Sequence, residues 1–169
     1  ETENAKKGLP SGITVKVNSL VDPKIIELLY EASKAGVRVQ LIVRGICCLI
    51  PGIEGVSENI TVMSIVGQLL EHSRIFRFEN AGNPRIYMGS ADWMPRNLDR
   101  RVELVFPIED ETQKARAFGI LDTMLSDTTN ARFMQSDTSY EHVDLRGKKK
   151  ISSQLTFYHE AQARLKELQ

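Results

Sequence analysis

The sequence predicts an α/β domain, and the first part of the chain carries the main observation. Apolar and polar residues alternate over 13–17, which is the pattern of a β-strand with one buried face. A helix follows, with Asp22 placed at its N-cap, Pro23 in its first turn and Gly36 at its end. Residues 37–43 alternate again. Strand, helix and strand in this order form a right-handed crossover between parallel strands, which is the basic unit of an α/β fold.

Further strands and helices are expected along the rest of the chain. Strands are expected over residues 60–65, 74–78, 85–88 and 101–107, and a short strand pair over 131–135 and 140–143. The turn at 80–84 contains Gly82 and Pro84, so it joins the strands on either side of it into a hairpin. Helices are expected over 109–127 and 153–168, and the first of them has acidic residues in its first turn.

The length and the ends of the chain suggest how it is organised. Its 169 residues suffice for one domain with a sizeable core. Residues 1–12 are polar and contain glycine and proline, so we interpret them as a linker, with the domain over 13–169. The chain starts at Glu1 rather than at methionine, and we expect it to be a piece of a longer protein.

Charge and cysteine content narrow the classes of function. The 22 Lys and Arg residues balance the 22 Asp and Glu residues, so a general basic surface is not supported and no nucleic-acid partner is expected. Any anion site must therefore be local. Cys47 and Cys48 are adjacent, which disfavours a disulfide between them and favours a reduced, cytoplasmic protein. Charged residues interrupt the longest apolar stretch, so no membrane span is expected, while peripheral membrane association is left open.

The basic residues in the middle of the chain are all arginines, apart from His72. There is no lysine between Lys34 and Lys114, whereas arginine occurs there at positions 38, 44, 74, 77, 85, 96, 100 and 101. A guanidinium group presents planar, paired donors that match phosphate oxygens better than an ammonium group does. The pattern favours a phosphate site. A composition bias that leaves solvated arginines on strand faces is the other interpretation.

The ends of the first two predicted strands are candidate positions for ligand binding. In open parallel sheets, ligands gather where the carboxyl ends of the strands meet. Asn18 and Ser19 follow the first strand, and Arg44 closes the second after an apolar run. Because an unpaired charge is costly to bury, Arg44 either points into water or clamps a ligand at this edge.

His72 is the candidate for proton transfer or charge stabilisation. It stands two residues before Arg74, and residues two apart on an extended backbone project from the same face. Histidine titrates nearest neutrality, which suits proton transfer to a phosphate. A structural role for a single histidine is the alternative. His142 and His159 have no such neighbours in the sequence and are interpreted as surface residues.

A Gly89-Ser90 pair closes the strand that follows the predicted hairpin turn. Glycine at this position lets backbone N–H groups approach an anion, and Ser90 adds a hydroxyl donor. The pair is a weak signal alone and a stronger one about one hairpin after His72-Ser73-Arg74.

These motifs resemble the signature of the phospholipase D superfamily, His-x-Lys followed by Gly-Ser-x-Asn, with Arg74 in place of the lysine and Asp92 in place of the asparagine. The resemblance implies a mixed β-sheet flanked by helices, in a single domain that forms half of a two-domain catalytic module. A more specific resemblance covers segments 18–22, 41–49, 71–76 and 89–103, which are similar to the C-terminal catalytic domain of bacterial polyphosphate kinases.

The second resemblance implies a definite chemistry. Polyphosphate kinases transfer the terminal phosphoryl group of ATP reversibly to inorganic polyphosphate, giving ADP, through a phosphohistidine and with Mg²⁺. The phosphorylated histidine belongs to a preceding domain of the same polypeptide, so the isolated chain is expected to be inactive, and the longer protein is expected to be a homo-oligomer. The resemblance assigns phosphate binding to Arg44 and His72, with His72 as the catalytic residue in this half. Ser90, Arg74 and Arg101 are further phosphate-binding candidates from their geometry, and no metal ligand is assigned.

Two other functions are kept for comparison. A homodimeric phosphodiesterase could pair two copies of His72, although Arg74 and Asp92 depart from the hydrolytic pattern. A binding module without catalysis would use the arginines alone. Trp93 is interpreted as core packing rather than as a platform for a purine ring.

Overall fold

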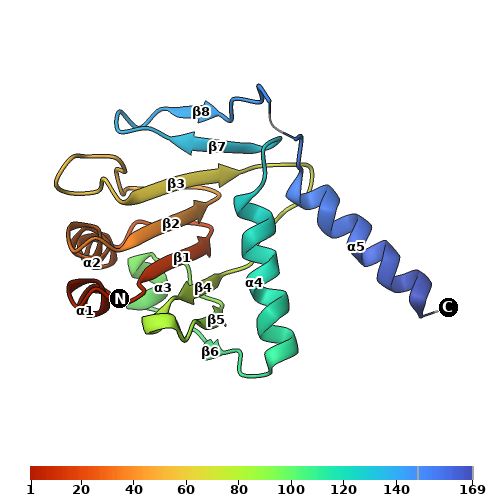
Figure 1. The fold of residues 1–169 in the computed structure, drawn as a ribbon, viewed down its shortest axis with the longest axis horizontal. Helices are drawn as coiled ribbons and strands as arrows, with labels where there is room; N and C mark the ends of the chain where they lie inside the picture. Colours follow the sequence, from red (N-terminus) through yellow and green to blue (C-terminus); the bar gives the residue numbers. More distant parts are fainter. Residues whose placement is uncertain (148, 169) are drawn as a thin grey trace.

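The computed structural model describes residues 1–147 and 149–168, and its centre is one eight-stranded sheet (Figure 1). The strand order is β6-β5-β4-β1-β2-β3-β7-β8. The strands are β1 (Gly12–Val17), β2 (Arg38–Val43), β3 (Ile60–Ile65), β4 (Ile75–Phe78), β5 (Arg85–Gly89), β6 (Val105–Pro107), β7 (Ala131–Met134) and β8 (Tyr140–His142). The helices are α1 (Thr2–Lys6), α2 (Pro23–Lys34), α3 (Pro95–Leu98), α4 (Glu111–Leu125) and α5 (Ser153–Glu167), with a 3₁₀ turn at Asn80–Gly82.

The predicted strand–helix–strand unit is present. β1 pairs with β2 in parallel, with Val15 opposite Leu41, and β2 pairs with β3 in parallel. Asp22 caps α2, because its carboxylate accepts a hydrogen bond from the Ile25 amide at 3.0 Å. The predicted hairpin is also confirmed, since β4 and β5 are antiparallel. Because β4 is also antiparallel to β1, the sheet is mixed, as the family resemblance implied.

Two apolar cores lie on the two faces of this sheet. Alternate strand residues such as Val15 and Leu41 belong to the first core, to which α2 contributes Leu29 and Ala32. The intervening residues, such as Ile42, belong to the second core, to which α4 contributes Ala117, Leu121 and Met124. Helix α5 then extends away from the sheet to the C-terminus (Figure 1). Trp93 stacks on Phe76 with ring centroids 5.5 Å apart, so its predicted role in core packing is confirmed.

Several boundaries differ from the sequence prediction. Helix α1 lies in the segment interpreted as a linker, and Glu1 ties that segment to the domain by accepting hydrogen bonds from the amides of Gly12 and Asn80. The predicted strand over 101–107 is shortened to β6, and α3 was not expected. The apolar alternation there was misleading because Val102 and Leu104 are exposed at an edge of the sheet. Lys148, within the basic segment 146–150, lies outside the described residues.

Candidate active site

Most of the predicted site residues lie at one edge of the sheet. We use the term carboxyl edge for the end of the sheet at which β1 and β2 have their C-terminal residues, as distinct from the outer strands β6 and β8. Because β4 runs antiparallel to β1, and β5 antiparallel to β4, the start of β4 and the end of β5 meet at the same edge. Asn18, Arg44, Arg74 and Ser90 stand directly beside these strand ends.

Backbone pairing beyond the strands fixes the loops of the carboxyl edge. Leu20 forms parallel bridges with both Cys47 and Trp93. The amides of Val21 and Asp22 donate to the Trp93 carbonyl at 2.8 and 2.9 Å, and the Trp93 amide donates to the Ser19 carbonyl at 3.1 Å. This pairing holds the segment around residue 92 directly against the end of β1.

Asp92 is the centre of a buried hydrogen-bond network. Its carboxylate accepts from the backbone amides of Asn18 and Ser19 at 2.7 and 3.3 Å, and from Arg74 Nη2 and Nε at 2.8 and 3.3 Å. Asp92 is only 5% exposed, and burial by itself would raise the pKa of its carboxyl. The hydrogen bonds from Arg74 and from the Asn18 amide outweigh burial, so the pKa of Asp92 lies below its ordinary value.

Arg74 uses its remaining donors on His72. Nη1 lies 3.2 Å from His72 Nδ1 and donates to the His72 carbonyl at 3.0 Å, while Nη2 lies 3.3 Å from Nε2. The guanidinium therefore faces the imidazole ring, and the ring itself is exposed. The predicted proximity of these two side chains is confirmed, although β4 begins only at Ile75 and both residues precede it. With its nitrogens engaged by Asp92 and His72, Arg74 is placed to hold the histidine.

Among the described residues, Arg44 is anchored through one side-chain nitrogen. Its Nε donates to Asn18 Oδ1 at 3.0 Å, and Asn18 is itself buried. None of the ion pairs among residues 1–147 and 149–168 involves Arg44. Asn18 Nδ2 is buried without a hydrogen-bond partner in the described part of the chain. Asn18 therefore connects Arg44 to Asp92, because its side chain accepts from Arg44 and its backbone amide donates to Asp92.

The Gly89-Ser90 segment is used differently from its sequence interpretation. The Gly89 amide donates to the Arg74 carbonyl and the Ser90 amide to the Leu104 carbonyl, so neither N–H is open to an anion. The Ser90 hydroxyl donates to Glu103 and accepts from the Leu104 amide at 3.0 Å. A Cβ at position 89 would lie 2.7 Å from the Leu104 carbonyl oxygen. Glycine is therefore required here by the close approach of the neighbouring chain, and the interpretation of these amides as anion donors is wrong.

Glu103 and Arg101 complete this side of the edge. Glu103 also accepts from Asn97 Nδ2 at 2.6 Å. The hydrogen bond from Ser90, followed by that from Asn97, lowers the pKa of Glu103, and the charge of Arg101 acts in the same direction. Arg101 is exposed on the loop before β6.

Lys16 is a functional candidate that the sequence analysis missed. It lies in β1 and is 1% exposed, and its Nζ donates to the carbonyls of Glu71 and Ser73 at 3.5 and 3.2 Å. Burial lowers the pKa of Lys16 to about 8. The two carbonyls flank His72, so Lys16 braces the backbone that carries the histidine. The alternation over 13–17 placed Lys16 on the polar face of a strand. Alternation does not show whether both faces of a sheet are covered, so it did not indicate that Lys16 is buried.

The acidic side chains of the carboxyl edge do not fit a magnesium site. The oxygens of Asp92 are occupied by Arg74 and backbone amides, and those of Glu103 by Ser90 and Asn97. Within the described ranges, no group of three or more His, Cys, Asp or Glu side chains is arranged to hold a metal ion. We therefore assign no metal ion to these residues.

Comparisons with known proteins identify the class of protein and then the family. A phospholipase D family member, Nuc from Salmonella typhimurium, matches with a TM-score of 0.54 at 15% identity over 80% of this chain and 89% of that one. The chain thus has a phospholipase D-like fold. Residues 1–154 match the family described as polyphosphate kinase C-terminal domain 2, and the chain belongs to that family.

Relatives from this family are similar over nearly the whole chain. Polyphosphate kinase of Lactiplantibacillus plantarum is 54% identical over 162 residues, which are 96% of this chain and 23% of that protein. The crystal structure of polyphosphate kinase from Porphyromonas gingivalis matches with a TM-score of 0.92 at 38% identity, over 96% of this chain and 25% of that one. The chain therefore spans about a quarter of the length of these relatives. None of the described helices is long and apolar enough to cross a membrane.

Proposed function

We propose that the carboxyl edge is the nucleotide-phosphate half of a site that transfers the terminal phosphoryl group of ATP reversibly to inorganic polyphosphate. The observation that carries the proposal is the continuous network from His72 through Arg74, Asp92 and Asn18 to Arg44. It joins an exposed imidazole to an unpaired guanidinium at the edge where open sheets bind ligands. Membership of the polyphosphate kinase family supports the substrate assignment.

Arg44 is the proposed anchor for the nucleotide's phosphates. Asn18 holds its Nε, which leaves the two terminal nitrogens to donate in parallel to phosphate oxygens. The amide of Asn18 is buried, so the guanidinium is oriented before the ligand arrives. A pre-oriented charge stabilises the developing negative charge of phosphoryl transfer without reorganisation at the moment of reaction.

His72 is the proposed catalytic residue of this half. His72 is exposed, Arg74 contacts its ring, and Lys16 holds the backbone on either side of it. In this position the imidazole can donate to the transferred phosphoryl group or exchange a proton with it. The nucleophilic histidine belongs to a preceding domain of the full-length enzyme, which uses Mg²⁺. The isolated chain is therefore expected to be inactive, and the enzyme is expected to assemble as a homo-oligomer.

Arg74, Ser90 and Arg101 have lesser proposed roles. Arg74 acts mainly by positioning His72, since its donors face His72 and Asp92. Ser90 fixes the loop that carries Arg101 through its hydrogen bonds with Glu103 and the Leu104 amide. Arg101 remains a proposed phosphate contact because it is exposed beside this network.

The test uses a full-length polyphosphate kinase that carries this domain. Arg44→Ala and His72→Ala are each expected to lower kcat/KM for ATP formation from polyphosphate and ADP by at least about a hundredfold, as loss of one transition-state donor does. Arg38→Ala is the matched control, because Arg38 is exposed at the opposite end of β2, and it should keep the original rate.

A second assay separates the proposal from hydrolysis. The isolated chain is offered a chromogenic model phosphodiester, which a homodimeric phosphodiesterase with paired His72 residues would cleave. Turnover that disappears in His72→Ala would contradict the kinase proposal. Full kinase activity in His72→Ala with loss only in Arg44→Ala would instead favour a site that binds phosphate without using the histidine.

A further inference from the structure

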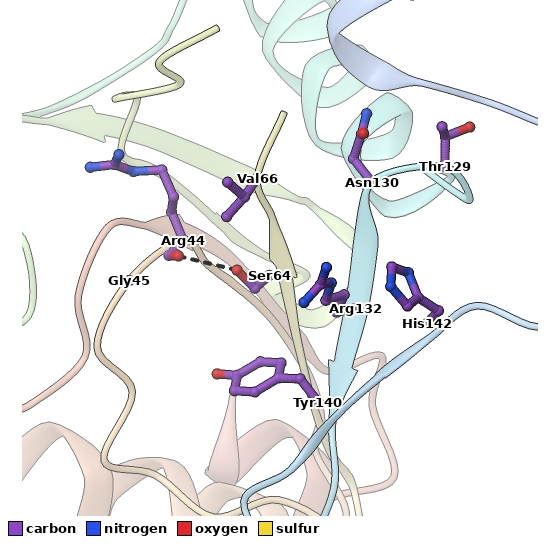
Figure 2. A pocket seen from close by; sticks show the side chains of 9 residues that line it. All are labelled: Arg44, Gly45, Ser64, Val66, Thr129, Asn130, Arg132, Tyr140 and His142. Atoms are coloured by element: carbon purple, nitrogen blue, oxygen red, sulfur yellow. Dashed lines mark hydrogen bonds between the residues drawn. The ribbon is translucent and has the colours of Figure 1, made fainter. Parts of the chain in front are cut away.

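A second set of basic side chains lies at the carboxyl edge, on the part of the sheet farthest from Ser90. Arg132 of β7 is opposite Ser64 of β3 and opposite His142 of β8. Side chains directly opposite one another on paired strands project from the same face of the sheet. Figure 2 shows Arg132 and His142 side by side, as this register requires. The strand pairing thus brings together two residues that lie ten positions apart in the sequence.

These side chains line a cavity that they share with Arg44 (Figure 2). The cavity has a volume of about 440 Å³, and Ser64, Thr129, Asn130 and Tyr140 add polar groups to its wall. The hydroxyl of Ser64 donates to the Arg44 carbonyl at 3.1 Å, which fixes the end of β2 against β3. His142 was interpreted from the sequence as a surface residue without company. His142 is exposed, and it lines the same cavity as Arg44.

The charges around this cavity are unbalanced. Arg44, Arg132 and His142 are among its lining residues, and none of its described lining residues is acidic. Arg132 forms no ion pair with any residue of the described ranges, whereas Arg74 and Arg77 are paired with carboxylates. An unpaired arginine on a concave surface raises the local concentration of anions and matches phosphate oxygens in geometry. The cavity is therefore suited to a ligand with several negative charges.

We propose that this cavity is a chain subsite, in which Arg132 and His142 bind condensed phosphate that continues from the phosphate group bound by Arg44. The inference rests on the proposed function and adds the residues that would hold the polymer. A condensed phosphate carries a negative charge on every unit, so a sufficiently long chain can reach Arg132 and His142 from a unit bound by Arg44, whose guanidinium points away from Arg132 in Figure 2. A single nucleotide phosphate group would use only one end of the cavity.

The experiment compares two polyphosphate lengths with ADP as the second substrate. In the full-length enzyme, Arg132→Ala is expected to raise KM for long-chain polyphosphate by about tenfold, the value of one charge-assisted contact to phosphate of about 1.4 kcal/mol. KM for tripolyphosphate should rise less, and KM for ADP should stay within about twofold. Arg132→Lys should recover part of the loss. Arg38→Ala is the control, as an exposed strand arginine at the opposite edge.

Each outcome bears on the proposal. An unchanged KM for long-chain polyphosphate in Arg132→Ala overturns it, and so does a larger rise in KM for ADP, which would make the cavity a nucleoside site. Because Arg132 is exposed, the variant is expected to fold, and its unfolding midpoint is measured alongside. Failure of the proposed function would look different: Arg44→Ala and His72→Ala would then retain their phosphoryl-transfer rates.

Discussion

The two sides of the carboxyl edge use arginine in opposite ways. On one side, Arg74 is paired with Asp92 and packed against His72, and most of its donors are satisfied within the protein. On the other side, Arg44 and Arg132 line a cavity whose described lining residues include no acidic side chain. At this edge, the arginine with a carboxylate partner, Arg74, holds the site together. Arg44 and Arg132, which pair with no carboxylate of the described residues, are available to a ligand.

The comparison is tested most severely at Asp92. Replacing it with alanine removes the acceptor for Arg74 and for the amides of Asn18 and Ser19, and leaves a partly buried guanidinium unpaired. Breaking a buried pair in this way costs about 3–5 kcal/mol. We expect the free energy of unfolding of Asp92→Ala, measured in urea, to fall by an amount in this range. Asp122→Ala is the control, because Asp122 pairs with Arg77 at an exposed position.

The pH dependence of the Asp92 contribution has a defined sign. The pKa of Asp92 is lower in the folded chain than its ordinary value of 3.8, so its contribution to stability is complete above that value. It is lost as the pH falls through the folded pKa. The stability difference between wild type and Asp92→Asn should therefore shrink below about pH 4. A difference that grows with acidification would contradict the assignment of Asp92 as the ionised partner of Arg74.

Lys16 gives a smaller effect, at alkaline pH. The folded chain releases the Lys16 proton at about pH 8, whereas the ordinary pKa is 10.5. Between these values the unfolded chain binds more protons, so the free energy of unfolding rises with pH in this window. We expect the wild type to gain stability relative to Lys16→Met between pH 8 and 10.5, measured by urea unfolding at several pH values. If the two stability curves run parallel over this pH range, the pKa of Lys16 is not lowered in the folded chain, and its burial is contradicted.

The sequence predicted those features that local pattern determines. The alternation over 13–17, the Asp22-Pro23 helix start and the hairpin turn each correspond to an observed element. The contact between His72 and Arg74 was also predicted, because the two residues are close in the chain. The pairing of β7 with β8, which sets Arg132 opposite His142, was predicted and is confirmed. Features that depend on distant strands were not predicted. The pairing of β7 with β3, which places both residues beside the end of β2, was not predicted, because no short-range motif records it.

The same limit explains the wrong interpretation of Gly89 and Ser90. A glycine followed by serine at a strand end is compatible with an anion-binding turn or with a close backbone approach. The Leu104 carbonyl lies where a side chain at position 89 would be, and that neighbour is contributed by the segment before β6. Lys16 was missed for a related reason, since its burial depends on the loop that carries His72.

The central claim is tested most directly by measuring stability and phosphoryl transfer together in Arg44→Ala and Arg74→Ala. Both variants of the full-length enzyme should lose activity. Arg44→Ala should change the free energy of unfolding by less than about 1 kcal/mol, as for an arginine without an ion-pair partner. Arg74→Ala should lower it by about 3 kcal/mol, because Asp92 is left without its cation. Equal losses of stability in the two variants, or full activity in Arg44→Ala, would contradict the account.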